Sequence, residues 1–200
     1  MSIEIKFMRR IGVLGGSFNP PTIGHQNVIE QAFPHFDEIL LVPSLAHAFH
    51  KKFIAIEHRL AMLQLLIKHW ENQSGLNKVK ILNIEQQLLE AQNEYAPIYT
   101  YDVLNAVEAL YLGSYEQYKI QFIVGPDLAV KEVWEKFYRY QDIETKWPLF
   151  LVKELFPIHS TQIKEIITQK KNSPDALKMA ISPYLDPDIC EYILENHLYE

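Results

Sequence analysis

The chain has 200 residues, a formal net charge of −6 and 48% hydrophobic residues, values typical of an ordinary globular protein. The negative charge argues against a protein that coats nucleic acid, although a basic pocket for an anionic ligand can form on an acidic surface. A single cysteine, Cys190, excludes an intrachain disulfide and favours a reducing, cytoplasmic location; the absence of an apolar run of about 18 residues argues against a membrane span.

Short apolar runs alternate with longer amphipathic runs along the chain. In chain order the pattern predicts a strand at 9–16, a helix at 24–36, a strand at 37–43, a helix at 55–70, a strand at 78–84, a helix at 99–111, a strand at 118–125, a helix at 128–137, a strand at 148–154, and helices at 160–171 and 186–199. With no repeat and no linker, this order predicts one domain, residues 1–200, of class α/β with a doubly wound, mainly parallel sheet.

Three stretches with unusual residues follow predicted strands. "GGSFNPPTIGH" at 15–25 follows the first strand, "GPD" at 125–127 follows the fourth, and the loop before residue 160 follows the fifth. Ligands of such sheets bind beyond the carboxyl ends of the strands. We therefore expect these three stretches to meet at one cleft.

The stretch at 15–25 suits an anionic ligand. Gly15 and Gly16 let the backbone turn and approach a ligand, and the free N–H groups of the following helix form an anion site. Thr22 and His25 are three residues apart and therefore share one face. The pattern is neither a Walker loop nor a dinucleotide fingerprint. It favours phosphoryl or nucleotidyl transfer over a strand–turn–helix junction with an incidental histidine.

The same stretch resembles the signature of the nucleotidyltransferase superfamily that carries a (His/Thr)-x-Gly-His motif, here "TIGH". Other segments resemble nicotinate mononucleotide adenylyltransferases, in family order: "YTYDVL" at 99–104, "FIVGPD" at 122–127, "VWEKFYRYQDI" at 133–143, "IHSTQIKEII" at 158–167 and "ICEYILENHLY" at 189–199. The resemblance spans nearly the whole chain. It implies a Rossmann-like nucleotidyltransferase fold with C-terminal helices, and transfer of AMP from ATP, with Mg²⁺, to a pyridine mononucleotide.

The resemblance also implies the residues of the site. An ATP site would use Gly15, Gly16, Ser17, Phe18, Thr22, His25, Gly125, Asp127, Ser160, Thr161 and Lys164. Catalytic roles would fall to His25, Thr22 and Lys164, with no protein ligand for the metal. A mononucleotide site would use Ser17, Lys51, Tyr99, Thr100, Asp127 and Trp134, with Trp134 stacking on the pyridine ring.

Several of these residues also fit ordinary roles, because Ser160 and Asp127 can cap helices and tryptophans commonly pack in cores. The chain also departs from the family pattern: His159 replaces a serine, Lys164 replaces an arginine, and Asn19 stands where aspartate is frequent. Lysine keeps the charge of arginine but loses its two-pronged grip on phosphate.

The resemblance favours nicotinate mononucleotide as the acceptor, with deamido-NAD as the product of a step in NAD biosynthesis. Nicotinamide mononucleotide is an alternative, since "EHRLAM" at 57–62 has some likeness to relatives that prefer it. Phosphopantetheine adenylyltransferase and a nucleotide-binding regulator with weak turnover are further alternatives. Chain length and the Trp134 segment oppose the first, and the Thr22–His25 motif opposes the second. A homo-oligomer is left open.

Overall fold

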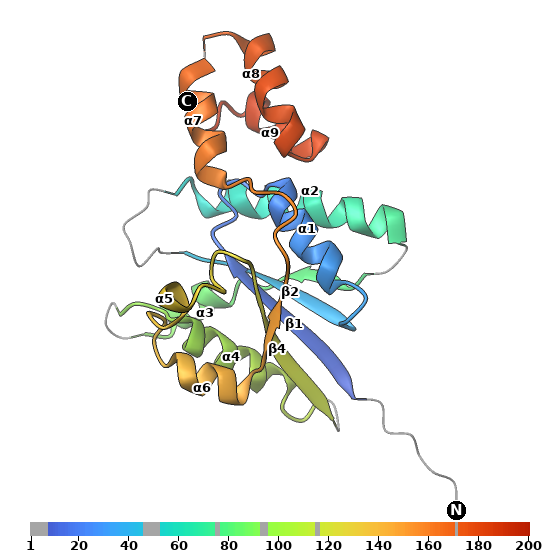
Figure 1. Ribbon diagram of the computed structural model, residues 1–200, viewed down its shortest axis with the longest axis vertical. Coiled ribbons are helices and arrows are strands. Elements are labelled where there is room, and N and C mark those ends of the chain that lie inside the picture. Colours follow the sequence, from blue (N-terminus) through green and yellow to red (C-terminus); the bar gives the residue numbers. More distant parts are fainter. Residues whose placement is uncertain (1–7, 46–52, 75–76, 93–95, 115–116, 171) are drawn as a thin grey trace, which may run out of the picture.

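The computed structural model describes residues 8–45, 53–74, 77–92, 96–114, 117–170 and 172–200 (Figure 1). Within these residues, five strands form one parallel sheet in the order β3-β2-β1-β4-β5. The strands are β1 Arg9–Gly16, β2 Glu38–Pro43, β3 Val79–Ile81, β4 Tyr118–Val124 and β5 Leu149–Leu151. Chain order reverses between β1 and β4, which is the place where doubly wound sheets bind ligands. The predicted fold class is confirmed.

Helices cover both faces of the sheet (Figure 1). One face packs against α1 Ile23–Ala32 and α2 Ile56–Ser74, and the other packs against α3 Ile84–Glu90, α4 Thr100–Tyr111, α5 Lys131–Trp134 and α6 Tyr140–Lys146. The chain continues with α7 Ser160–Lys170, α8 Pro174–Ile181, the 3₁₀ turn η1 Ser182–Tyr184 and α9 Pro187–Glu195. Among the described residues, no helix combines the length and the apolar character needed to cross a membrane.

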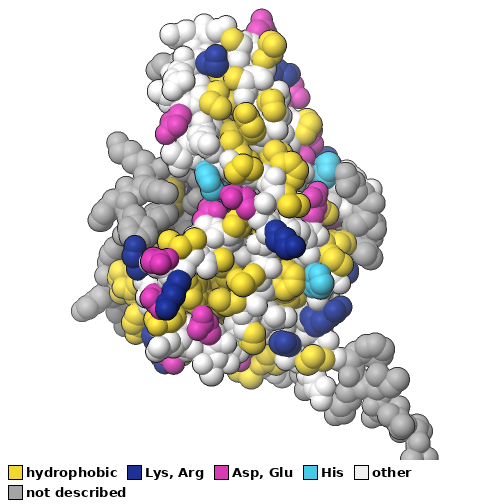
Figure 2. All heavy atoms as spheres, viewed as in Figure 1, with side chains coloured by type: hydrophobic (Ala, Val, Ile, Leu, Met, Phe, Trp, Pro, Cys, Tyr) yellow, Lys and Arg dark blue, Asp and Glu magenta, His cyan; other side chains and the backbone are white. Residues whose placement is uncertain are grey.

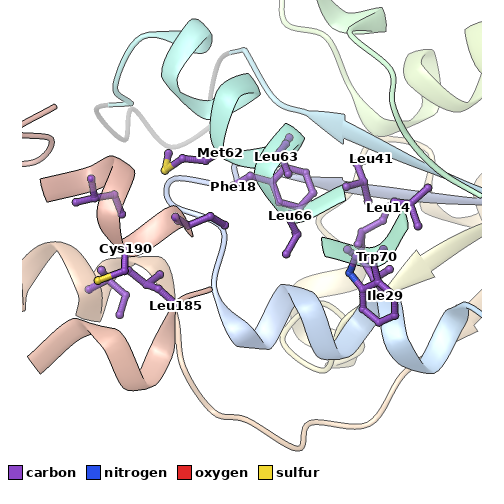
Figure 3. Packing of buried hydrophobic residues seen from close by; sticks show 14 of the residues in the cluster. Leu14, Phe18, Ile29, Leu41, Met62, Leu63, Leu66, Trp70, Leu185 and Cys190 are labelled. Atoms are coloured by element: carbon purple, nitrogen blue, oxygen red, sulfur yellow. The ribbon is translucent and has the colours of Figure 1, made fainter. Parts of the chain in front are cut away.

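The C-terminal helices share a hydrophobic core with the first sheet face. Figure 3 shows members of this core from both parts of the chain: Phe18 and Met62, and also Leu185, which precedes α9, and Cys190 of α9. These four side chains are buried, and Phe18 has no exposed surface at all. A residue of the loop after β1 therefore anchors in the same core as α9.

The structure corrects several predicted boundaries. The helix predicted at 24–36 ends at Ala32, because Pro34 lies just beyond it and cannot continue a helix. The helix predicted at 128–137 contains only the four-residue α5, and the strands predicted at 78–84 and 148–154 pair over three residues each. Helices α3, α6 and α8 were not predicted, because each spans only seven or eight residues, too few for a clear periodic pattern.

Candidate active site

A cleft of about 250 Å³ lies at the carboxyl ends of β1 and β4, near the lower limit for ligand pockets. Residues from all three predicted stretches line this cleft. It brings together the predicted residues Gly15, Ser17, His25, Gly125, Asp127, Ser160, Thr161 and Lys164. The expected convergence of the three stretches is therefore observed, although the first stretch is 100 or more residues away from the other two in the sequence.

The start of α1 fixes the ring of His25. Thr22 is the N-cap residue of α1; its backbone N–H donates to His25 Nδ1 at 3.1 Å, and its hydroxyl lies 3.0 Å from the same nitrogen. This arrangement is a capping box in which an imidazole takes the place of the usual glutamate or glutamine. Because Nδ1 accepts a hydrogen bond, the proton of the neutral ring lies on Nε2. Thr22 itself is buried, so it acts on the cleft by orienting His25.

The protein surroundings keep the His25 ring neutral. Burial lowers the pKa of His25 to about 4, and the charge of Asp127 opposes this shift. At pH 7 the side chain is therefore an uncharged hydrogen-bond donor rather than a cation. A donor of this kind can stabilise negative charge that develops on a phosphoryl oxygen.

Contacts from two distant elements hold the loop after β1. The buried Arg59 of α2 donates from one terminal nitrogen to the carbonyls of Ser17 at 2.9 Å and Ser44 at 2.6 Å. The hydroxyl of Ser160, at the start of α7, donates to the carbonyl of Pro20 at 2.8 Å. The first turn of α7 is thus attached directly to the loop that precedes α1.

Gly24 allows the closest approach of α1 to the segment before α7. A Cβ atom at this position would lie 3.1 Å from the carbonyl oxygen of Ile158 and 3.4 Å from that of Phe156. Both contacts are to backbone atoms, which cannot move as a flexible side chain would. A side chain at this position would press on the backbone at 156–158, so packing as well as the open anion site favours the glycine of "TIGH".

Charged side chains gather at the mouth of the cleft. His159 Nδ1 lies 3.3 Å from an Asp127 carboxylate oxygen, and one ligand atom each of Asp127, Glu154 and His159 lie within 4.8 Å of one another. Figure 2 shows histidine and acidic side chains side by side below the C-terminal helices. Lys153 and Lys164 also line the cleft. Sequence reasoning missed Lys153 and Glu154 because it placed them inside a strand; their position at a strand end was the available signal.

Other predicted site residues lie outside this cleft. Gly16 ends β1, and Phe18 and Thr22 belong to the loop that follows; these three residues do not line the cleft. Lys51 falls outside the described residues.

Trp134 and Tyr99 lie among aromatic residues away from the described cleft. Trp134 is 5% exposed, donates from Nε1 to Glu144 at 2.8 Å and packs against Phe137 with ring centres 4.9 Å apart. Tyr99 is exposed and packs against Tyr138 at 4.7 Å, while Thr100, also a predicted mononucleotide residue, begins α4. The predicted stacking of a pyridine ring on Trp134 would require this indole to leave its packed position.

The doubly wound sheet, the loop that presents a neutral imidazole and the two helix N-termini at one cleft define a Rossmann-like nucleotidyltransferase. Residues 13–166 match the model of the cytidylyltransferase-like family. Because this match covers more than half of the chain, the protein belongs to that family.

The chain is also similar to individual relatives and solved structures that are named nicotinate-nucleotide adenylyltransferases. The nicotinate-nucleotide adenylyltransferase of Bacillus subtilis (strain 168) is 29% identical over 217 residues, covering 96% of this chain and 100% of the relative. A structure from Vibrio parahaemolyticus, assigned to the nicotinate-nucleotide adenylyltransferases, has a TM-score of 0.74 and 29% identity over 96% of both chains. The Plasmodium falciparum nicotinic acid mononucleotide adenylyltransferase, solved with NaAD, has a TM-score of 0.64 and 25% identity over 96% of this chain and 97% of that one.

Proposed function

We propose that this protein is a nicotinate-nucleotide adenylyltransferase. It transfers the AMP moiety of ATP to nicotinate mononucleotide and forms deamido-NAD and pyrophosphate, a step of NAD biosynthesis. The observation that carries the proposal is the convergence of His25, Asp127 and Lys164 on one cleft at the carboxyl ends of β1 and β4. The match with relatives of this activity over almost the full chain supports the same assignment.

The reaction needs no nucleophile from the protein. An oxygen of the mononucleotide 5′-phosphate forms a bond to the α-phosphorus of ATP, and the bond from that phosphorus to the bridging oxygen breaks to release pyrophosphate. Catalysis of such a transfer rests on positioning and charge stabilisation. We assign His25 Nε2–H as a donor to the α-phosphate, because Thr22 occupies Nδ1 and the low pKa keeps the ring neutral.

The cleft offers space and a lysine side chain for the triphosphate. An added Cβ at Gly125 would meet no atom within 4 Å, so the strand end leaves room for a ligand. Lys164 lies in the first turns of α7, and its charge adds to the positive end of that helix. We propose that Lys164 and Thr161 hold the departing phosphates, while Ser160, which already donates to Pro20, positions α7.

The residues at the cleft mouth fit the Mg²⁺ ion that reactions of ATP commonly use. Asp127 and Glu154 supply carboxylate oxygens, the ligand type that Mg²⁺ prefers, and their ligand atoms lie within 4.8 Å of each other. We propose that these two residues hold the ion together with water. When bound there, Mg²⁺ would neutralise charge on the pyrophosphate.

The proposal also names the acceptor, the residues near it and the cellular location of the protein. We propose nicotinate mononucleotide as the acceptor. The resemblance of their segments to the family supports Tyr99, Thr100 and Trp134 near its pyridine ring, and stacking on Trp134 would require the indole to leave its contacts with Glu144 and Phe137. The single cysteine, Cys190, is buried and unpaired, which fits the reducing cytoplasm where we place this activity.

A substrate panel tests the proposal. The purified protein is assayed with ATP, Mg²⁺ and nicotinate mononucleotide, nicotinamide mononucleotide or phosphopantetheine, with pyrophosphate release measured continuously and the adenylylated product identified by mass. We expect the highest kcat/KM with nicotinate mononucleotide. Preference for nicotinamide mononucleotide would correct the acceptor, and absence of product with all three, with ATP binding intact, would reject the enzyme assignment.

A further inference from the structure

The C-terminal end of the chain returns to the loop after β1. The chain turns sharply after α9, where His197 and Tyr199 adopt left-handed backbone angles, with φ of 49° and 69°. Residues other than glycine rarely adopt this backbone conformation, so the surrounding contacts must maintain it. The turn directs the Tyr199 side chain toward the other segments that border the loop.

Tyr199 makes the shorter of two contacts that orient the side chain of Asn19. Its hydroxyl donates to Asn19 Oδ1 at 3.1 Å, and the backbone N–H of Ile54 donates to the same oxygen at 3.5 Å. Asn19 is 1% exposed, and in the described part of the chain its Nδ2 has no hydrogen-bond partner. The orientation of this buried amide therefore depends on Oδ1, and chiefly on Tyr199.

Asn19 occupies a central place in the loop that forms the cleft. It lines the cleft itself and lies between Phe18, whose φ is 46°, and Pro20. The Pro20 carbonyl accepts the hydroxyl of Ser160, so two neighbouring loop residues are held by the C-terminal part of the chain. A shift of the Asn19 amide would consequently displace the backbone on which the cleft is built.

We propose that Tyr199 is a positioning residue for the nucleotide cleft, which it serves by holding Asn19. The proposal rests on the proposed adenylyltransferase function. Without the hydroxyl, the 3.5 Å contact to Ile54 is the one hydrogen bond that remains for the Asn19 amide among the described residues, and a buried polar group without good partners forces local rearrangement. Transfer of a phosphoryl group depends on alignment within a fraction of an ångström, so a small loop shift reduces turnover while the fold persists.

The test compares two tyrosines of the same C-terminal region. Tyr199→Phe removes the hydroxyl that holds Asn19 and retains the ring. Tyr192→Phe is the matched control, because the Tyr192 hydroxyl lies 3.0 Å from His58 Nδ1, and neither residue lines the cleft. We expect Tyr199→Phe to lower kcat/KM about tenfold, as for one lost hydrogen bond, and to speed hydrogen–deuterium exchange in the peptide covering 15–25. The control should change neither.

A double-mutant cycle with Asn19→Ala assigns the effect. If Tyr199 acts through Asn19, Tyr199→Phe adds no further loss of kcat/KM and no faster exchange in the Asn19→Ala background. Asn19→Ala also breaks the same contact from the other end should Tyr199→Phe fail to fold. Unchanged exchange at 15–25 in Tyr199→Phe overturns the proposal, and so does faster exchange with wild-type kinetics.

Two readouts separate this proposal from the assigned activity. If the wild-type protein forms no dinucleotide, the adenylyltransferase assignment fails on its own. The exchange of 15–25 and the affinity for ATP, measured by calorimetry, then decide the role of Tyr199. Weaker ATP binding with faster exchange in Tyr199→Phe supports Tyr199 as a positioning residue for the cleft. Unchanged ATP affinity and unchanged exchange refute it.

Discussion

Replacement of His25 separates two functions that one imidazole performs. Nδ1 accepts the backbone N–H of Thr22 and completes the cap of α1, while Nε2–H is the donor assigned to the α-phosphate. His25→Ala removes both functions. His25→Gln keeps the cap, because glutamine is a usual residue at this position of a capping box, and it retains an amide donor with shorter reach.

The two functions have different magnitudes and different readouts. Loss of one donor to a developing oxyanion costs about 2.7–4 kcal/mol of transition-state stabilisation, or about 100- to 1,000-fold in kcat. Loss of a cap costs about 1 kcal/mol of stability, which for a chain of this size lowers Tm by about 2–4 °C. We therefore expect kcat to fall from wild type to His25→Gln to His25→Ala. Tm should fall in His25→Ala alone.

Steady-state kinetics at saturating ATP and nicotinate mononucleotide, together with scanning calorimetry, measure both effects. The pH dependence provides a further check, because the ring is neutral above its pKa of about 4 and should not limit kcat between pH 6 and 8. A His25→Ala enzyme with kcat within about threefold of wild type would be inconsistent with a donor of this strength, whatever its Tm.

Three further outcomes follow from the geometry. Gly24→Ala should lower Tm by several degrees and reduce kcat, because its Cβ would lie 3.1 Å from the Ile158 carbonyl; a normal melting curve would show that the two segments can separate at little cost. Gly125→Ala should leave Tm unchanged, since no atom lies within 4 Å of its Cβ, and raise the KM for ATP several-fold; unchanged kinetics would place ATP elsewhere. Burial raises the pKa of Glu85 from 4.5 to about 7, so the folded protein loses stability relative to the unfolded chain as pH rises between these values. Glu85→Gln, which can still accept the N–H of Leu45, should remove this loss, on the order of 2–3 kcal/mol. Urea unfolding of both proteins at pH 5 and pH 8 measures it, and equal pH dependence would contradict the assigned burial.

The central strands were predictable because burial on both faces leaves continuous apolar runs in the sequence. Strands β1, β2 and β4 match their predicted ranges closely. The edge strands β3 and β5 each pair with one neighbour and are three residues long. The strand predicted at 148–154 ends at Leu151, and Lys153 and Glu154 line the cleft instead.

Local motifs also predicted that three separate stretches would meet at one cleft. Individual contacts between distant residues could not be predicted from the sequence. The placement of His25 follows from the strand–loop–helix order and the rule for ligand sites in parallel sheets. The contact of Tyr199 with Asn19 spans 180 positions and depends on a backbone turn after α9. No periodicity or composition encodes such a contact, which only the packed chain creates.

Contacts from several parts of the chain hold the loop after β1, and they connect stability with function. Phe18 sits in the loop with a left-handed backbone angle, yet its ring is fully buried in the core shared with α2 and α9. Arg59, Ser160 and Tyr199 add polar contacts from three other parts of the chain. A reaction without a protein nucleophile depends on the positions of the reacting groups. A loop that is already ordered before the ligand binds holds these positions without a further loss of conformational entropy. The C-terminal part of the chain thus supports the cleft in two ways: α7 lines it with Ser160, Thr161 and Lys164, and Ser160 and Tyr199 hold the loop after β1.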